Sequence, residues 1–310
     1  MADSSVRPKD YYIKNSQFTE NTHLDAYPAI DPRKPDHNLD GKVAIITGAS
    51  RGIGKRAMVP AFVAAGVKGI VLLATDAEKL AITEQEIKND NPNIETLPLA
   101  LDMSDEKAVE AGFERVRNKF GHAHVFINCA GAHLGDGPKL HETDIDLWWR
   151  NFEVNAKGLY LLIRAFLRLL PSPDTRATIL NLSSWQAFFL APPMGAYFMT
   201  KFVVDSLTTY VAIEYPNVTA VSMHPGVLDT DMCREPFLSQ TDNNSFKLVG
   251  GMAVWICQDK ARFLSGRWIS ASWDVDDLVK KQDEISKHDL LKLTLRGNFG
   301  PTRLSRESEL

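Results

Sequence analysis

The chain alternates short apolar runs with longer stretches in which apolar residues recur at helical spacing. Seven runs predict strands: KVAIIT, GIVLL, IETLPLA, HVFIN, ATILNLS, VTAVSM and RWISA. Continuous Val, Ile and Leu runs are typical of parallel strands that are buried on both faces. The intervening stretches predict helices, which run up to about residue 66, over about 76–89, 104–120, 143–170 and 246–258, and through GAYFMTK. This alternation predicts an α/β domain with one doubly wound sheet covered by helices on both faces.

The alternation is missing at the two ends of the chain. Residues 1–38 are polar, contain four prolines and lack any periodicity, which predicts an extended or partly disordered N-terminal extension. A single α/β domain is then expected over residues 39–273. Residues 274–310, with the helical-looking DLLKLTL, are expected to form a partly helical C-terminal appendage.

Composition excludes several classes of partner. A net charge of -4 over 310 residues leaves no broad basic surface, so nucleic acid is not expected to bind. The most apolar helical stretch, GLYLLIRAFLRLL, is too short to span a membrane and carries two arginines. Three widely spaced cysteines, Cys129, Cys233 and Cys257, indicate a reducing compartment. Because the N-terminus also lacks an apolar signal core, we expect a cytoplasmic protein.

The first predicted strand runs into the glycine-rich turn TGASRGIG, residues 47–54, and a helix follows. In this context Gly48 permits a tight turn, Gly52 lets the backbone approach a pyrophosphate, and Gly54 lets the helix pack closely on the strand. The helix N-terminus then faces the phosphates. The pattern predicts a dinucleotide site, with further contacts expected from Ser50, Arg51 and Ile53.

The end of the second predicted strand bears on the choice of cofactor. An acid there binds the ribose diol of NAD and repels the 2′-phosphate of NADP. The sequence has Ala74 and Thr75 at this point, followed by Asp76, which is also suited to cap the next helix. Arg51 and Lys55 add positive charge beside the turn. We therefore expect NADP(H) to be favoured over NAD(H).

The stretch GAYFMTK places Tyr197 four residues before Lys201, on one face of a predicted helix. A free phenol ionises near pH 10, so acid–base work at neutral pH requires a pKa lowered by about three units. A nearby ammonium group and an oxidised nicotinamide ring supply such an effect. For an isolated pair, the common interpretation is an interfacial tyrosine and a lysine that reaches solvent.

Further motifs in order favour a catalytic interpretation. Ser184 lies in NLSS, thirteen residues before Tyr197, and Asn155 lies in FEVNA. Together with TGASRGIG, LDMSD, NCAG, YFMTK and HPGVLDT, they make residues 39–272 resemble the short-chain dehydrogenase/reductase family in its single-domain form. The resemblance implies a Rossmann-type sheet of about seven parallel strands in the order 3-2-1-4-5-6-7.

The resemblance also implies the catalytic roles. Tyr197 is expected to be the general acid in reduction and the base in oxidation, with Lys201 binding the nicotinamide ribose and lowering the phenol pKa. Ser184 is expected to hydrogen-bond the substrate oxygen, while Asn155 holds a water that links Lys201 to solvent.

Other cofactor contacts follow from the same resemblance. Asp102 matches the acid that contacts the adenine amine, and Asn128 matches the residue that steadies the sheet beside the cofactor. Cys129 departs from the commoner asparagine at its position. The loop expected to close over the nicotinamide contains Pro225, Gly226 and Thr230. Two residues beside Asn128, Ala130 and Gly131, are expected to line the cofactor.

The segment between Ser184 and Tyr197 lines the substrate pocket in this family. Its apolar residues Trp185, Phe188, Phe189 and Met194 predict a bulky lipophilic substrate, although core or subunit contacts explain any one of them equally well. A second wall is expected from residues 228–250, which include a mobile lid.

Metal binding is not expected, because His122, His124, His133 and His141 match no known ligand spacing. The predicted helix at 143–170 and the helix that follows Tyr197 are apolar around most of their circumference. In the family these helices pair across a two-fold axis, so a homodimer or homotetramer is expected.

The resulting hypothesis is an oxidoreductase that interconverts a carbonyl and an alcohol on a small molecule, with a role in secondary metabolism suggested by likeness to fungal members. Two alternatives stay open at this point. One is a biosynthetic enzyme of the same fold without net redox chemistry, such as an isomerase, dehydratase or cyclase, and the other is a nucleotide-bound regulatory protein.

Overall fold

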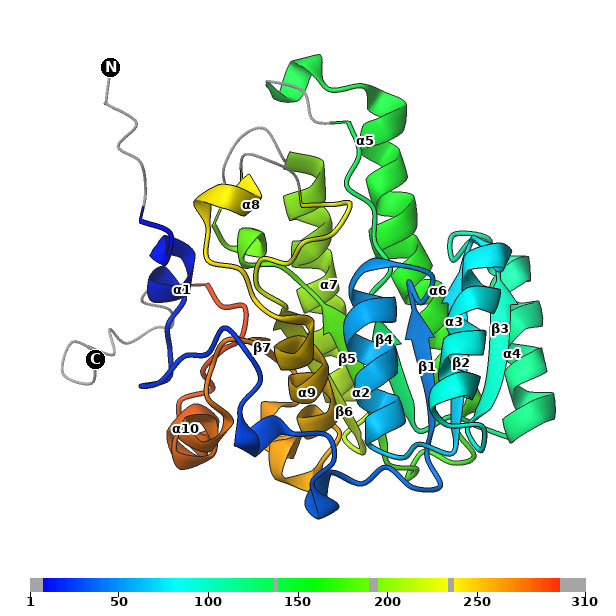
Figure 1. The fold of residues 1–310 in the computed structure, drawn as a ribbon. Helices are drawn as coiled ribbons and strands as arrows, with labels where there is room; N and C mark the ends of the chain where they lie inside the picture. Colours follow the sequence, from blue (N-terminus) through cyan, green and yellow to red (C-terminus); the bar gives the residue numbers. More distant parts are fainter. Residues whose placement is uncertain (1–7, 136–138, 190–194, 234–236, 296–310) are drawn as a thin grey trace, which may run out of the picture.

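A computed structural model describes residues 8–135, 139–189, 195–233 and 237–295 (Figure 1). Its centre is a seven-stranded sheet in the order β3-β2-β1-β4-β5-β6-β7, with every neighbouring pair parallel. The strands are β1 (Val43–Thr47), β2 (Gly69–Ala74), β3 (Glu95–Ala100), β4 (Val125–Asn128), β5 (Ala177–Leu182), β6 (Val218–His224) and β7 (Arg267–Ser270). The expected fold class and strand order are confirmed.

Helices cover both faces of this sheet (Figure 1). One face carries α2 (Val59–Ala64), α3 (Ala77–Asp90) and α9 (Phe246–Ile256). The other carries α4 (Glu106–Phe120), α5 (Ile145–Phe152), α6 (Leu159–Leu169) and α7 (Gly195–Glu214). Successive strand residues enter opposite cores, as Ile45 and Ile46 do in β1, which explains why apolar residues follow one another in the strands without alternation.

The helix expected at 143–170 is interrupted by a π-helical turn, Glu153–Gly158, between α5 and α6. A second π turn, Gly54–Met58, precedes α2 directly after the glycine-rich turn. Such wide turns are rare in proteins, and those that occur often lie at functional sites. Both of them adjoin residues expected to bind the cofactor or to act in catalysis.

Residues 8–38 and the residues that follow β7 pack together against the body. Residues 8–38 contain α1 (Tyr11–Asn15) and short 3-10 turns, and Ile30 is fully buried. Residues after β7 form α10 (Val275–Lys280) and α11 (Gln282–Lys287), whose apolar side chains join the core. The remaining short elements are Pro28–Ile30, Pro35–His37, Leu140–Glu142, Trp185–Ala187, α8 (Phe237–Gln240) and Asp259–Leu264.

Candidate active site

The site begins where β1 and β4 end side by side. The hydroxyl of Thr47 donates to Oδ1 of Asn128 at 3.0 Å and accepts from the amides of Cys129 and Ala130. All four residues are contributed by two adjacent parallel strands and the turn after β4. The expected steadying role of Asn128 has a physical basis here, with Thr47 as a partner that sequence reasoning did not identify.

The glycine-rich turn has the conformation that its sequence predicts. Gly48 and Gly52 both have positive φ, at 65° and 57°. A Cβ on Gly54 would collide with the backbone of Gly48, so only glycine permits this close approach of helix and strand. At Gly52 the nearest atom to an added Cβ is Cγ2 of Thr230, at 3.9 Å, which leaves open space above the turn.

This open space belongs to a cavity of 480 Å³ beside the turn. Its basic side consists of Arg51, Lys55, Arg56 and Lys79, while Asp229 and Asp231 form its acidic side. The lining thus has more positive than negative groups. Ser50, Gly52 and Thr230 complete the part of the wall that the sequence analysis assigned to the cofactor.

Three of these cations pair with acids: Lys79 with Asp76, and two more beside the glycine-rich turn. Arg51 pairs with Asp231 at 2.8 Å, although both side chains are largely exposed. Lys55 pairs with Glu86 at 2.9 Å. Exposed pairs of this kind contribute little to stability, so an anion could take the place of either acid at small cost.

Asp76 caps α3, accepting from the backbone amide of Lys79 at 3.0 Å and pairing with its ammonium group. Thr75 beside it is exposed. At the end of β3, Asp102 accepts from Ser104 and, at 2.6 Å, from Arg150. Burial alone would raise the pKa of Asp102, but these hydrogen bonds outweigh it and hold the pKa below its usual range.

Tyr197 and Lys201 lie together on α7, as their spacing predicts. The ammonium nitrogen of Lys201 lies 5.5 Å from the centre of the Tyr197 ring and donates to the carbonyl of Leu182 at 2.7 Å. Burial raises the pKa of Tyr197 to about 12, opposed by a hydrogen bond with Ser184. Burial lowers the pKa of Lys201 to about 8. The expected lowering of the phenol pKa by Lys201 is therefore not found in this structure, where burial dominates and the opposing effect comes from Ser184.

Asn155 lies in the π turn between α5 and α6 and is almost fully buried. Its amide exchanges two hydrogen bonds with the backbone of Ala132 and donates to Thr200 Oγ1 at 3.0 Å. A Cβ on Gly131 would lie 3.3 Å from Oδ1 of Asn155 and 3.8 Å from Nζ of Lys201. Asn155 thus ties the turn after β4 to α7 beside the lysine.

Two residues near Tyr197 were not assigned to the site from the sequence. The ring of His133 lies 4.9 Å from that of Tyr197. Asp205, one turn beyond Lys201, is buried among Ser183 and Ser222, and burial raises its pKa to about 7. Hydrogen bonds with Ser183 and Ser222, and then the charge of Lys201, oppose this rise. A spacing of four after Lys201 was the available signal for Asp205.

The expected substrate residues are described only in part. The rings of Trp185 and Phe188 pack against Trp268 of β7, at centroid distances of 5.8 and 5.5 Å. Phe188 is 42% exposed and Phe189 is half-buried, so both retain surface for a ligand. Met194 lies outside the described residues.

The loop after β6 is held by one buried asparagine. Asn244 exchanges hydrogen bonds with the backbone of Val227 and donates to Ser272 Oγ at 2.8 Å. Its side chain fills the space that a Cβ on Gly226 would need. Pro225, Gly226 and Thr230 are therefore positioned from the segment just before α9.

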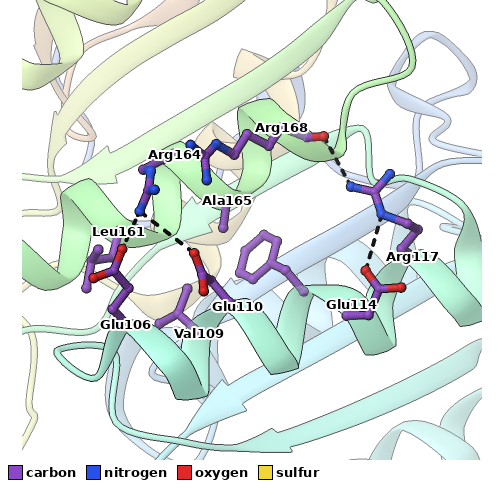
Figure 2. Close-up of a pocket in the computed structure, with 10 residues that line it drawn as sticks. Glu106, Val109, Glu110, Glu114, Arg117, Leu161, Arg164, Ala165 and Arg168 are labelled. Atoms are coloured by element: carbon purple, nitrogen blue, oxygen red, sulfur yellow. Dashed lines mark hydrogen bonds and ion pairs between the residues drawn. The ribbon is translucent and has the colours of Figure 1, made fainter.

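Other features of the described chain carry no comparable chemistry. A hollow of 140 Å³ between α4 and α6 is lined by charged groups that pair with each other, such as Arg164 with Glu106 and Glu110 (Figure 2). Over the described residues there is no group of three or more His, Cys, Asp and Glu side chains that could hold a metal ion. None of the described helices is both long and apolar enough to cross a membrane.

Comparison with known proteins places this geometry in a family. The model for "short chain dehydrogenase" matches residues 42–240. Short chain dehydrogenase mpl6 of Monascus purpureus is 35% identical over 289 residues, which cover 90% of this chain and 96% of that protein. Short chain dehydrogenase pigC of Monascus ruber is 34% identical over 298 residues, covering 92% and 94%.

Solved structures have the same fold. A short-chain type dehydrogenase/reductase from Mycobacterium ulcerans matches with a TM-score of 0.68 and 25% identity, covering 75% of this chain and 89% of its own. A gluconate 5-dehydrogenase from Burkholderia cenocepacia, in complex with NADP and tartrate, matches with a TM-score of 0.69 and 22% identity, covering 78% and 96%.

Proposed function

Because the chain belongs to the short chain dehydrogenase family, we propose that it is an NADP(H)-dependent oxidoreductase that interconverts a carbonyl and an alcohol on a bulky lipophilic small molecule. The observation that carries this proposal is the convergence of the Tyr197 phenol, which is partly buried, with the buried side chains of Lys201 and Ser184. A cluster of this kind is costly to bury and has a ready use in proton transfer.

The proposed chemistry needs a hydride for the carbonyl carbon and a proton for its oxygen. The residues fit a dinucleotide, since the positive φ of Gly52 and the open space above it leave room for a pyrophosphate. When bound, reduced nicotinamide supplies the hydride. Tyr197 would donate the proton from its phenol, while Ser184 would hold the substrate oxygen in place. Lys201 would stabilise the resulting phenolate by its charge.

NADP(H) is favoured in this proposal by the charge around the cavity. Arg51, Lys55, Arg56 and Lys79 gather where the adenosine end would lie, and Asp76 is occupied as a helix cap. A bulky lipophilic substrate is favoured by the exposed part of Phe188 beside Trp185. A homodimer or homotetramer, a cytoplasmic location and a role in secondary metabolism stay predictions.

The decisive experiment follows the oxidation of NADPH in the presence of a panel of aliphatic and aromatic ketones, with products identified by mass spectrometry. We expect one alcohol formed per NADPH consumed, and no such consumption in the absence of a ketone. Product formed without NADPH consumption would instead favour redox-neutral chemistry.

Replacing the acid tests its role directly. We expect Tyr197→Phe to lower kcat/KM on the order of 100-fold or more, because the phenol is the proposed proton donor. Tyr210→Phe is the matched control, since Tyr210 is exposed on the same helix. Full turnover by the Tyr197→Phe enzyme would remove the proposed acid–base role.

A further inference from the structure

Residues 8–27, here called the N-terminal arm, precede the part of the chain that matches the family model. They run beside α8 and the segment that follows β7 (Figure 1). We propose that the N-terminal arm is a positioning element of the substrate site, and that it limits how the site accommodates a bulky substrate. The proposal rests on the proposed oxidoreductase function.

The arm is fastened to the chain just after β7. The indole nitrogen of Trp273 donates to the carbonyl of Ser16 at 2.7 Å. Asp277 accepts from both the backbone and the side chain of Asn21, at 2.9 and 3.0 Å. His23 donates its amide to the carbonyl of Ser272 at 2.8 Å.

A line of aromatic rings leads from the arm to the expected substrate wall. Phe18 packs against Trp273 with a centroid distance of 5.3 Å, and Trp273 meets Trp268 edge to face at 5.6 Å. Trp268 in turn supports Trp185 and Phe188. Because close-packed rings leave little free volume, removing one ring loosens the next. Phe18 thereby supports the substrate wall without touching it.

A second connection runs through the expected lid. The amide of Asp242 donates to the carbonyl of Lys9 at 3.1 Å, and the amide of Ser245 donates to that of Leu24 at 2.8 Å. Between these two bonds lies Asn244, which holds the loop at Gly226 and Val227. The arm therefore fixes two points of the segment between α8 and α9. A lid with two fixed points in this segment has less freedom to move than one without them.

The experiment compares Phe18→Ala with Arg33→Ala, whose side chain lies beyond the arm and is largely exposed. The probes are a two-ring aromatic ketone and a small aliphatic ketone, each with NADPH. For Phe18→Ala we expect KM for the two-ring ketone to change about fivefold or more, with a change of less than about twofold for the small ketone and for the dissociation constant of NADPH. Equal changes for both ketones would overturn the proposal, since general destabilisation does not discriminate by substrate size.

A readout without substrate separates this proposal from the proposed function. Hydrogen exchange is measured on the full chain, on Phe18→Ala and on a chain lacking residues 2–10, which removes the acceptor at Lys9. We expect faster exchange at residues 185–189 for the first variant and at 241–245 for the second, with the thermal midpoint confirming that each is folded. Unchanged exchange in both segments would overturn the proposal. If no ketone is reduced by the unmodified enzyme, the proposed function fails while the exchange result still decides the positioning role.

Discussion

Asp205 shows how one buried residue can set the electrostatics of the site. It lies one helical turn beyond Lys201 and is 4% exposed. Burial raises its pKa to about 7, opposed first by hydrogen bonds with Ser183 and Ser222 and then by the charge of Lys201. Two buried ionisable groups this close in the chain stabilise each other's charged forms.

The raised pKa of Asp205 predicts a pH-dependent stability. An acid whose pKa is higher in the folded state stabilises the fold below its unfolded value near pH 4 and loses that contribution as the pH rises through about 7. We therefore expect Asp205→Asn to gain stability relative to the unmodified chain, on the order of 3 kcal/mol, between about pH 4 and about pH 8. Urea unfolding across this range measures the difference.

The control for this experiment is Asp90→Asn, because Asp90 is exposed at the end of α3. Its stability difference from the unmodified chain should vary little with pH. A difference for Asp205→Asn that is equally flat would mean that Asp205 has an ordinary pKa in the fold.

At the scale of elements, α7 has two faces with separate tasks. Tyr197 and Lys201 point to the site, while Met199, Phe202, Tyr210 and Ile213 share the opposite face and are all more than 40% exposed. An exposed apolar row of this size is typical of a protein interface. The one helix thus both positions Tyr197 and Lys201, the proposed catalytic groups, and presents the surface expected to pair subunits.

This second face predicts the effect of a charge placed on it. We expect the unmodified chain to be a homodimer or homotetramer by light scattering, and Phe202→Glu to lower its mass, because a buried unpaired carboxylate is costly at an apolar interface. Ile82→Glu is the control, since Ile82 is 53% exposed on α3, on the other face of the sheet. A monomeric mass for the unmodified chain, or an unchanged mass for Phe202→Glu, would contradict the prediction.

The elements also show where sequence reasoning succeeds and where it stops. Strands such as Val43–Thr47 are buried on both faces, so local composition alone identifies them. The π turn at Asn155 left no local signal, because its cause is the tertiary contact of Asn155 with Ala132 and Thr200. The stretch DLLKLTL looks helical in the sequence but does not form a helix. Asp289 and Leu291 have positive φ, and the carbonyl of Leu291 accepts a hydrogen bond from the amide of Trp268 in β7.

The residues of the candidate site also differ in whether the local sequence carries a signal for them. Tyr197, Lys201, Ser184 and the glycine-rich turn were proposed from local motifs, because the short spacings within each motif carry the signal. Asn244 was missed, since its partners lie far away in the sequence at Val227 and Ser272. Long-range partners of this kind are not encoded in any local pattern.

At the scale of the whole molecule, the cofactor proposal predicts a change in thermal stability. A ligand present at about 100 times its dissociation constant adds about 2.7 kcal/mol to the stability of the fold. We expect NADP+ to raise the thermal midpoint by several degrees and NAD+ at the same concentration to raise it less. Scanning calorimetry or fluorimetry measures both.

A charge reversal identifies the cause of such a difference. Arg51→Glu should reduce the stabilisation by NADP+ more than that by NAD+, because Arg51 lines the basic side of the cavity. Lys68→Glu, an exposed substitution outside this cavity, is the control. Equal stabilisation by both nucleotides in the unmodified chain would contradict the expected preference.

The attachment of the N-terminal arm also bears on how the protein is made. Asn21 and its partner Asp277 are 256 residues apart, and Trp273 is equally remote from Ser16. A ribosome delivers residues in order from the N-terminus, so the arm has to wait until Trp273 and Asp277 have been made before it meets these partners. The sheet can begin to assemble during translation, whereas the contacts of the arm form only after Trp273 and Asp277 have emerged. A nascent chain that stalls before Trp273 would hold most of the nucleotide-binding strands and lack the structure proposed to select a substrate.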